Sequence, residues 1–293
     1  MRGDSVTTVC LMWLGQQPTM TKRRLVNPFR EGPLMTTIAI LHPGEMGSAI
    51  GRALIGVGHE VFWLPAGRGP NTRTRAERAG LRDRSGVRGC DVVISICPPS
   101  AAVATARSIG EFEGTYVDAN AIAPQTAEEV CRIVREQGSA YVDGGLIGPP
   151  PGRPGTTRLY LSGVKADEVA GDFANSGVEA RILQGSDFAA SGLKMVYAAG
   201  TKISAGLVLA ARGAAAELGV EAALAQEWTL SQPDLEDRYR AALADAAVKG
   251  WRWKDEMLQI ADTFVGAGQP GEFGIAAAQV FARHSSQSMT HDK

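Results

Sequence analysis

Residues 38–64, IAILHPGEMGSAIGRALIGVGHEVFWL, decide the fold of this chain. An apolar run at 38–41 leads into a glycine-bearing turn, small residues follow, and Gly58 and His59 precede a second apolar run at 61–64. This order is typical of a strand, a tight turn, a helix and a second strand. In such a unit the turn brings backbone N–H groups and a helix N-terminus up to the pyrophosphate of a dinucleotide.

The glycine fingerprint in this turn is incomplete. Its six positions are His42, Pro43, Gly44, Glu45, Met46 and Gly47, so a histidine replaces the first glycine. Gly44 still allows the backbone to approach a phosphate, and Gly47 allows the helix to pack closely on the strand. Histidine resists the positive φ that glycine adopts, so we expect His42 to support the turn less easily. An ordinary turn without a ligand is the alternative, but the flanking elements favour a dinucleotide site at residues 43–47.

The segment after the second strand bears on the choice of cofactor. NAD enzymes commonly place an acidic residue there to bind the ribose hydroxyls, but residues 64–78 read LPAGRGPNTRTRAER, without an acid at the expected place. Arg68, Arg73 and Arg75 stand there instead. A guanidinium can bind a 2′-phosphate with two hydrogen bonds. We therefore expect NADP, with NADPH preferred over NADH and Arg68 as the main contact; a solvated basic loop is the alternative.

Length and charge set further bounds. The chain has 293 residues, enough for two domains with cores of their own. Its 30 Lys and Arg are balanced by 31 Asp and Glu, so no basic excess favours nucleic acid or an anionic membrane as a partner. The four cysteines, Cys10, Cys90, Cys97 and Cys131, show neither metal-ligand spacing nor a paired framework. We expect free thiols in a reducing, cytoplasmic compartment, no metal, and a small-molecule substrate.

Two segments require separate interpretation. Residues 1–34 show no hydrophobic periodicity, and Met35 stands directly before the first predicted strand. We interpret 1–34 as a disordered extension or a mis-assigned start. The longest apolar stretch, 195–225, is interrupted by charged residues, among them Lys202, Arg212 and Glu217, which argues against a membrane span.

Strands and helices continue to alternate after the first unit. Further strands are predicted at 91–96, 116–118, 140–143, 157–161 and 178–183, with helices between them, including 125–137. This alternation predicts an α/β fold with a largely parallel, doubly wound sheet of the Rossmann type. We assign residues 35–185 to this NAD(P)-binding domain, and we expect a loop to begin directly after Asp143.

The pattern becomes helical after Gly185. Residues 187–219 predict one long interdomain helix, with Asp187 or Ser186 as its N-cap and Gly219 at its end. More helices are predicted at 221–229, 234–249, 253–267 and 273–284. We assign residues 186–293 to a helical C-terminal domain for substrate binding and dimerisation. The small residues of the long helix let another helix approach closely; burial within the chain and a homodimer interface both remain open.

Four segments in a fixed order resemble a known family. They are the glycine turn followed by Gly58-His59-Glu60-Val61, the loop DANAIAP at 118–124, the segment DGGLIG at 143–148 with Gly155-Thr156-Thr157 after it, and SGLK at 191–194. Over about residues 36–285 this order resembles the β-hydroxyacid dehydrogenases, relatives of 6-phosphogluconate dehydrogenase. The resemblance implies an N-terminal NAD(P) domain, a long interdomain helix and a helical C-terminal domain.

The same resemblance implies roles for residues near the cofactor and the substrate. Asn120 stands where the family has a serine near the nicotinamide, and its amide can donate to a carboxamide or a substrate oxygen. Ile147 replaces the serine that contacts the substrate carboxylate, which puts the usual small hydroxy acid in doubt. We therefore predict cofactor contacts from Cys97, Pro98, Pro99 and Asn120, and substrate contacts from Asn120, Gly144, Gly145, Leu146 and Ile147.

Lys194 corresponds to the family's catalytic acid/base. Helical periodicity puts it on one face with Ser191, Tyr197 and Ala198, and we place Tyr197 and Ala198 in the substrate site; Ala198 replaces the asparagine of the family motif. A lysine in a closed apolar cleft beside a positive nicotinamide ring favours the neutral form that accepts an alcohol proton. A lysine that reaches solvent from an amphipathic helix is the alternative. The segment 251–257, WRWKDEM, lies near the family's Lys-Asp pair, but its register does not assign Lys254.

Together these patterns predict an NADP(H)-dependent dehydrogenase that transfers a hydride between nicotinamide and a hydroxy acid or its carbonyl counterpart. An imine or ketone reductase on the same scaffold is one alternative, because Ile147 and Ala198 make the pocket less specific for an anion. A non-catalytic NADP(H) sensor or scaffold is another. Its signature is cofactor binding without turnover.

Overall fold

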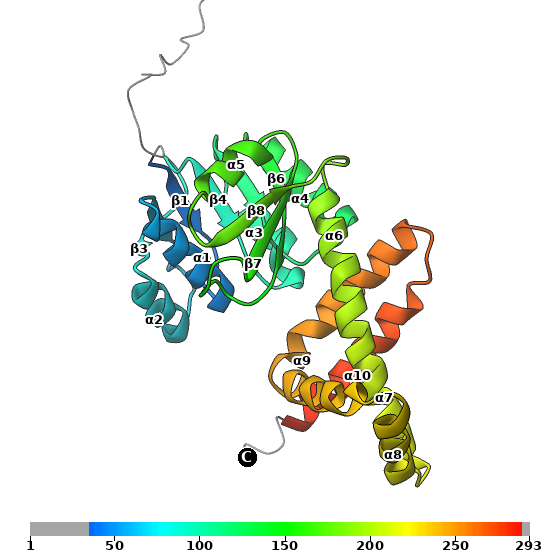
Figure 1. The fold of residues 1–293 in the computed structure, drawn as a ribbon. Coiled ribbons are helices and arrows are strands. Elements are labelled where there is room, and N and C mark those ends of the chain that lie inside the picture. Colours follow the sequence, from blue (N-terminus) through cyan, green and yellow to red (C-terminus); the bar gives the residue numbers. More distant parts are fainter. Residues whose placement is uncertain (1–34, 289–293) are drawn as a thin grey trace, which may run out of the picture. The chain divides into compact units, whose positions relative to one another are not determined.

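The computed structural model describes residues 35–288, with side chains through His284. The interpretation of residues 1–34, and Cys10 with it, lies outside the described residues. Within them, eight strands form one sheet in the order β3-β2-β1-β4-β5-β6-β7-β8 (Figure 1). The strands are β1 (Thr37–Ile40), β2 (Glu60–Trp63), β3 (Arg82–Asp83), β4 (Val92–Ser95), β5 (Thr115–Asp118), β6 (Ala140–Ile147), β7 (Thr157–Ser162) and β8 (Val178–Ile182).

The sheet is parallel from β3 to β6, and it reverses direction once. β6 pairs antiparallel with β7, which then pairs parallel with β8. The order reverses beside β1, since β2 lies on one side of it and β4 on the other. In open α/β sheets such a reversal leaves a crevice at the carboxyl ends of the strands. The predicted Rossmann-type fold class is therefore confirmed, and β1 ends at the predicted glycine turn.

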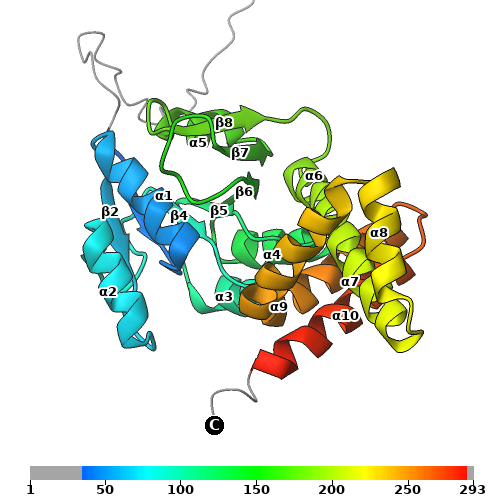
Figure 2. The ribbon, with the colours of Figure 1, turned by 60° about the horizontal axis from the view of Figure 1, so that its bottom comes forward.

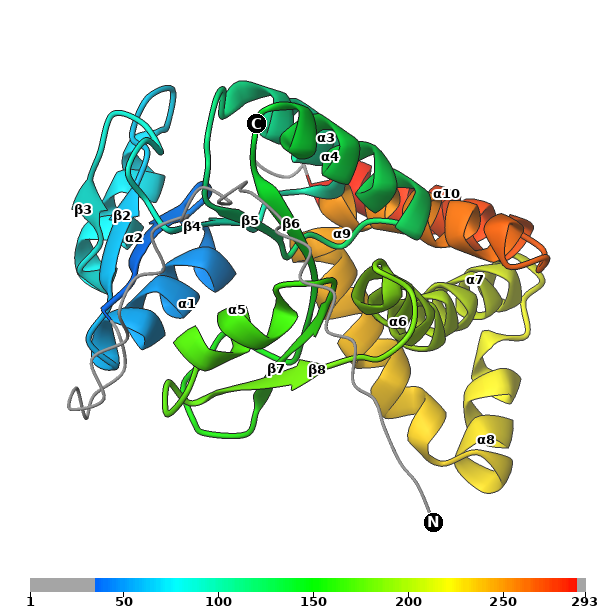
Figure 3. The same ribbon diagram turned by 90° about the horizontal axis from the view of Figure 1, so that it is seen from above.

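Helices cover both faces of the sheet, as Figure 3 shows from above. One face carries α1 (Glu45–Gly56), α2 (Pro70–Ala79) and α5 (Ala166–Asp172), and the other carries α3 (Ala102–Ser108) and α4 (Pro124–Glu136), with the short 3₁₀ turn η1 (Pro99–Ala101) before α3. Ile50 and Leu54 of α1 and Val130 of α4 are fully buried against the sheet. Cys90, Cys97 and Cys131 are free and buried.

Only helices follow the last strand within the described residues (Figure 2). They are α6 (Ala189–Ala198), the π-helix η2 (Ala199–Ile203), α7 (Ser204–Glu217), α8 (Glu221–Ser231), α9 (Asp234–Gly266) and α10 (Glu272–Ser288). α6, η2 and α7 continue one another without a gap, and Met195, Trp253 and Phe281 lie in a core shared by these helices, α9 and α10. The predicted boundary at 185 falls between β8 and α6.

Within residues 35–288, one helical run is long and apolar enough to cross a membrane by length and composition alone. This run is Ala189–Glu217, and 33% of its most apolar 18-residue stretch is buried in the structure. A helix in a protein core can have the same length and composition.

Three local expectations were wrong. β6 continues to Ile147 where we expected a loop from Gly144, because Gly144–Ile147 pair with β7. The helices predicted at 234–249 and 253–267 are the single helix α9, since the buried Gly250 lowers helix propensity by only about 1 kcal/mol and does not end a helix. The N-terminus of α6 is capped from the sheet: the backbone N–H of Ser191 donates to Asp143 Oδ2 at 2.7 Å.

Candidate active site

The turn between β1 and α1 keeps its backbone open to a ligand. Gly44 has φ −68° and ψ −165°, and a Cβ added there would meet no atom within 4 Å. A Cβ added to Gly47 would lie 2.3 Å from the carbonyl oxygen of His42. Gly47 therefore lets α1 pack against the end of β1, and Gly44 leaves room for an anion at the helix N-terminus. Pro43 is buried and Glu45 is exposed, and Met46 packs against the core under α1.

His42 does not strain this turn, contrary to our expectation. Among the non-glycine residues described, Asn175 alone has a positive φ. The His42 carbonyl accepts the Gly44 N–H at 2.8 Å, so the histidine closes the turn through its backbone. Its Nδ1 is buried without a hydrogen-bond partner, and burial, together with the positive charge of Arg68, lowers the pKa of His42 to about 4. The ring is therefore neutral at physiological pH.

The three arginines after β2 have different surroundings. Arg73 pairs with Asp83 at 2.9 Å and lies over the ring of Trp63. Arg75 donates to the Pro43 carbonyl at 3.5 Å and to Thr72 Oγ1. Arg68 is exposed and forms no ion pair within the described residues, and its charge acts on both His42 and Cys97. Of the three, Arg68 is the exposed arginine without an ion pair within the described residues, and Arg75 reaches the glycine turn as well.

Asn120 lies behind the site with its side chain already engaged. Its Oδ1 accepts the Cys97 N–H at 2.6 Å, and its Nδ2 donates to Ser95 Oγ at 3.1 Å. These bonds tie the ends of β4 and β5 together. Cys97 is buried and Pro98 is exposed, and the Asn120 side chain holds the backbone N–H of Cys97 in place. The predicted contacts of Asn120 with cofactor and substrate remain predictions.

Two buried carboxylates lie side by side, one at the end of β5 and one in the middle of β6. Asp118 and Asp143 are partners in the strand register, and both are fully buried. Asp143 accepts bonds from Ser162 Oγ and from the N–H and Oγ of Ser191, so it anchors α6 to the sheet. Asp118 accepts one bond, from the Asn120 N–H, and its Oδ2 has no partner. Burial, and then the charge of Asp143, raise the pKa of Asp118 to about 7.

The predicted substrate segment is a strand that packs against the lysine helix. A Cβ added to Gly145 would lie 2.7 Å from the Ala190 carbonyl and 3.1 Å from Lys194 Cβ. A Cβ added to Gly144 would lie 2.9 Å from the Asp118 carbonyl. Both glycines are therefore needed for close packing. Leu146 and Ile147 are buried, so Gly148 is the residue of this segment that reaches a cavity.

Lys194, Tyr197 and Ala198 line one cavity of about 510 Å³, together with Gly148 and residues of α9. Lys194 is partly buried, Tyr197 is about half exposed, and Ala198 is buried. The structure thus brings together the predicted acid/base, the end of the predicted substrate segment and the two predicted helix contacts. The glycine turn and Arg68 do not line this cavity.

The sequence analysis missed a buried ion pair beside this cavity. Lys202 of η2 pairs with the buried Glu256 of α9, and its Nζ lies 5.3 Å from the centre of the Trp253 ring. Burial lowers the pKa of Lys202, whereas the Glu256 carboxylate raises it. Lys254, which we left unassigned within the segment 251–257, is exposed. The sequence signal that pointed to this ion pair was the run of three charged residues at 254–256, one of which, Glu256, is buried in the structure.

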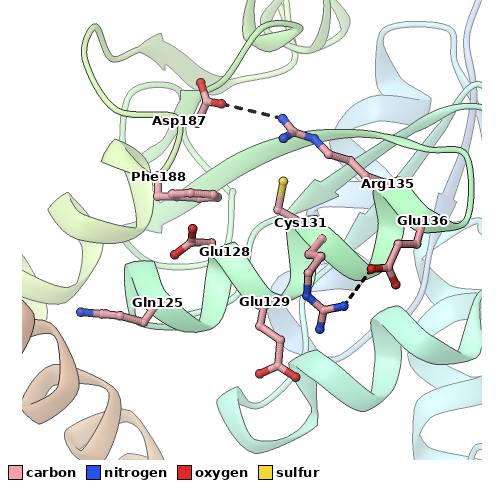
Figure 4. Close-up of a pocket in the computed structure, with 9 residues that line it drawn as sticks. Gln125, Glu128, Glu129, Cys131, Arg135, Glu136, Asp187 and Phe188 are labelled. Carbon is pink, nitrogen blue, oxygen red and sulfur yellow. Dashed lines mark hydrogen bonds and ion pairs between the residues drawn. The ribbon is translucent and has the colours of Figure 1, made fainter.

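A larger cavity, of about 850 Å³, opens on the outer side of α4 (Figure 4). Arg135 pairs there with Asp187 at 3.8 Å, and Cys131 and Phe188 also line the cavity. No residue predicted for cofactor or substrate binding lines it. The predicted acid/base, Lys194, lines the smaller cavity and not this one.

Comparisons with known proteins bear on both regions of the chain. A family described as "Domain of unknown function (DUF1932)" matches residues 215–284, in the helical region. An uncharacterized 28.5 kDa protein of Methanothermus fervidus is 27% identical over 166 residues, which are 55% of this chain. That match spans 64% of the length of the relative.

Solved structures match across both regions. A conserved protein of unknown function, reported as structurally similar to 3-hydroxyacid dehydrogenases, is 24% identical with a TM-score of 0.64, over 86% of this chain and 98% of that one. The Mycobacterium tuberculosis 3-hydroxyisobutyrate dehydrogenase, solved with L-serine, is 19% identical with the same TM-score, over 86% and 94%.

A more distant match is the reductive aminase of Aspergillus terreus in complex with NADPH and ethyl levulinate. It is 18% identical with a TM-score of 0.53, over 86% of this chain and 94% of that one. These matches cover the sheet and the helical region together. The chain therefore has the fold of the β-hydroxyacid dehydrogenases, as the order of its motifs predicted.

Proposed function

We propose that this protein is an NADP(H)-dependent oxidoreductase that acts on a hydroxy acid or its carbonyl counterpart, with Lys194 as the acid/base. The observation that carries the proposal is the position of Lys194, which packs against Gly145 and lines the cavity with Gly148, Tyr197 and Ala198. The fold it shares with a 3-hydroxyisobutyrate dehydrogenase supports the same reading.

The cofactor fits the crevice at the end of β1. Gly44 leaves open space, Gly47 allows close approach of α1, and Arg68 is available for a 2′-phosphate. Bound nicotinamide would accept or supply the hydride. The protein's own contribution is then to hold the substrate and move one proton: Lys194 Nζ takes the hydroxyl proton during oxidation and returns it during reduction.

A reductase acting on imines or ketones is the second candidate. The likeness to a reductive aminase solved with NADPH favours it, and Ala198, which lines the cavity, has no side-chain hydrogen-bond donor of its own. Retention of a lysine at 194 favours the hydroxy-acid reaction.

Turnover and cofactor binding of Lys194→Ala test the proposal together. We expect turnover of hydroxy acids with NADP⁺ to fall by about 10²–10⁴-fold, the usual contribution of a general acid/base. NADPH affinity, measured by energy transfer from tryptophan, should change little. Lys254→Ala is the matched control, because Lys254 is exposed and does not line the cavity.

Near-normal turnover of Lys194→Ala would remove Lys194 from the mechanism. NADPH binding without turnover of any hydroxy acid, ketone or carbonyl-amine pair would favour the sensor alternative. Turnover of the carbonyl-amine pairs alone would favour the imine reductase.

A further inference from the structure

The helix α6 takes its first hydrogen bonds from the sheet. Its N-cap residue, Phe188, offers no side-chain hydrogen bond to the first turn. Instead the Ala190 N–H donates to Ser162 Oγ of β7 at 3.0 Å. The Ser191 N–H donates to Asp143 Oδ2 of β6 at 2.7 Å. Because the first N–H groups of a helix have no partner within it, these two strands determine where α6 begins.

Asp143 binds Ser191 through both of its carboxylate oxygens. In addition to the backbone bond, Ser191 Oγ donates to Asp143 Oδ1 at 2.5 Å. Two bonds from one carboxylate to one residue fix the rotation of α6 about its axis as well as its position. Both residues are buried, so water does not compete for these bonds. We call this pair of hydrogen bonds the Asp143–Ser191 clamp.

The carboxylate of the clamp is ionised above its shifted pKa. Burial raises the pKa of Asp143 to about 6, and the bonds from Ser191 and Ser162 lower it. At about pH 8 the clamp therefore consists of charge-assisted hydrogen bonds, which are stronger than those between neutral groups. A negative charge at a helix N-terminus is also favourable.

Lys194 lies one turn beyond the clamp. It follows Ser191 by three residues, and residues at this spacing share one face of a helix. Asp143 and Gly145 share one face of β6, since side chains alternate along a strand. A Cβ added to Gly145 would lie 3.1 Å from Lys194 Cβ. The same face of β6 therefore meets α6 at two neighbouring points, at Ser191 and at Lys194.

The clamp does not belong to the lining of the cavity. Lys194 lines it, whereas Asp143 and Ser191 do not. On the other side of Lys194, α6 ends at Ala198 and the π-helix η2 follows, where the spacing of the backbone hydrogen bonds changes. The fixed end of the helix is therefore the end that Asp143 holds, and Asp143 reaches the chemistry only through α6.

We propose that Asp143 and Ser191 are positioning residues, whose clamp sets the place at which Lys194 Nζ enters the cavity and exchanges a proton with the substrate. The proposal rests on the oxidoreductase function proposed above and extends it to the residues that hold its acid/base. A positioning role affects the reacting geometry more than binding. We therefore expect the clamp to act on kcat, and to leave KM and NADPH affinity nearly unchanged.

Ser191→Ala tests the clamp in the full 293-residue chain, because it removes the hydroxyl bond and keeps the backbone bond to Asp143. The probes are 3-hydroxyisobutyrate, 3-hydroxybutyrate and glycerate with NADP⁺ at about pH 8. A misplacement of about 1 Å reduces a rate by about 10²-fold. Since one of the two bonds remains, we expect kcat to fall by about 10-fold, with KM and NADPH affinity within about twofold of the wild type.

Ser139→Ala is the matched control. Ser139 is also buried, and its Oγ donates one bond of 2.7 Å to the Phe112 carbonyl, at the opposite end of β6 from Lys194. Urea unfolding should show a similar loss of stability in both alanine variants, so a kcat that falls in Ser191→Ala alone is not a loss of folding. An equal fall of kcat in both variants would overturn the proposal.

Hydrogen exchange of residues 189–198, measured by mass spectrometry without substrate or cofactor, supplies a readout that does not need turnover. Exchange should be about 10-fold faster in Ser191→Ala, because one hydrogen bond to a charged group is lost. It should not change in Ser139→Ala. Unchanged exchange in Ser191→Ala would overturn the proposal, since the clamp would then not hold the helix of Lys194.

The two readouts separate this proposal from the function on which it rests. A wild-type protein that oxidises a probe, with an unchanged kcat in Ser191→Ala, would reject the positioning role and leave the oxidoreductase standing. Faster exchange in Ser191→Ala alone, in a protein that turns over no substrate, would reject the oxidoreductase and leave the clamp on the helix of Lys194 standing.

Discussion

Arg68 and Arg73 carry the same charge five residues apart, but their surroundings differ. Arg73 is held by Asp83 and the ring of Trp63, whereas Arg68 forms no ion pair within the described residues and acts on His42 at the glycine turn. At the residue scale, the preference for NADPH should therefore depend on Arg68 rather than on Arg73. An exposed ion pair such as Arg73–Asp83 contributes only about 0–1 kcal/mol.

Arg68→Gln should weaken NADPH binding by about 10–100-fold, the loss of a charge-assisted hydrogen bond to the 2′-phosphate. NADH binding should change little, and Arg73→Gln should leave both nearly as they are. Fluorescence titration with each nucleotide measures this. Equal weakening of NADPH and NADH in Arg68→Gln would contradict the assignment.

At the scale of elements, the β1–α1 turn separates the roles of two glycines. Gly47→Ala places a methyl group 2.3 Å from a backbone carbonyl, so we expect a loss of about 1–3 kcal/mol in the free energy of unfolding. Gly44→Ala meets no atom within 4 Å and has an ordinary φ of −68°. We expect its free energy of unfolding to stay within about 0.5 kcal/mol of the wild-type value. NADPH binding should weaken, because the added methyl group fills the space through which a phosphate approaches the turn. Urea unfolding and nucleotide titration distinguish the two.

If Gly44→Ala bound NADPH as tightly as the wild type, no phosphate would approach this turn. A Gly47→Ala variant with the free energy of unfolding of the wild type would show that α1 can move away from β1, so that close packing at this turn is not needed for stability.

Local patterns predicted the elements that local chemistry determines. The apolar runs at 38–41 and 91–96 became β1 and β4, and Gly219, with φ 70°, follows the end of α7 as expected. What remained unpredicted is non-local. The cap of α6 comes from Asp143 on β6, and β6 extends through Gly144–Ile147 because β7 pairs with it. Lys202 joins the cavity through a π-turn, which helical periodicity does not foresee.

At the scale of the whole molecule, the long helical run leaves much apolar surface uncovered. Leu207 is 69% exposed and Val196 is 51% exposed. We propose that a second copy of the chain covers them in a homodimer. Sedimentation at micromolar concentration should show a dimer, and Leu207→Glu should shift it to the monomer. Val164→Glu, a charge placed at an 88% exposed valine beside the sheet, should not. A monomeric wild-type protein would reject the dimer.

The buried pair Asp118–Asp143 makes stability depend on pH in a direction opposite to most carboxylates. The folded chain keeps the proton of Asp118 up to about pH 7, whereas the unfolded group has its ordinary pKa of 3.8. As pH rises between these values, the unfolded chain loses this proton and the folded chain does not, so this group's stabilising contribution is present below about pH 4 and lost through about pH 7. Asp143 accepts three donated bonds and Asp118 one, so Asp118 carries the proton.

Asp118→Asn removes this titration while its amide oxygen can still accept the Asn120 N–H. The free energy of unfolding of the variant, relative to the wild type, should rise by at least about 1 kcal/mol between pH 4.5 and 8, the equivalent of one pKa unit. Urea unfolding across that range measures it. Asp262→Asn, at an exposed aspartate of α9, is the control and should show no such slope. If the free energy of unfolding of Asp118→Asn and of the wild type changed with pH in the same way, Asp118 would be ionised in the folded protein. The Asp118–Asp143 pair would then be held by a charge partner rather than by a proton.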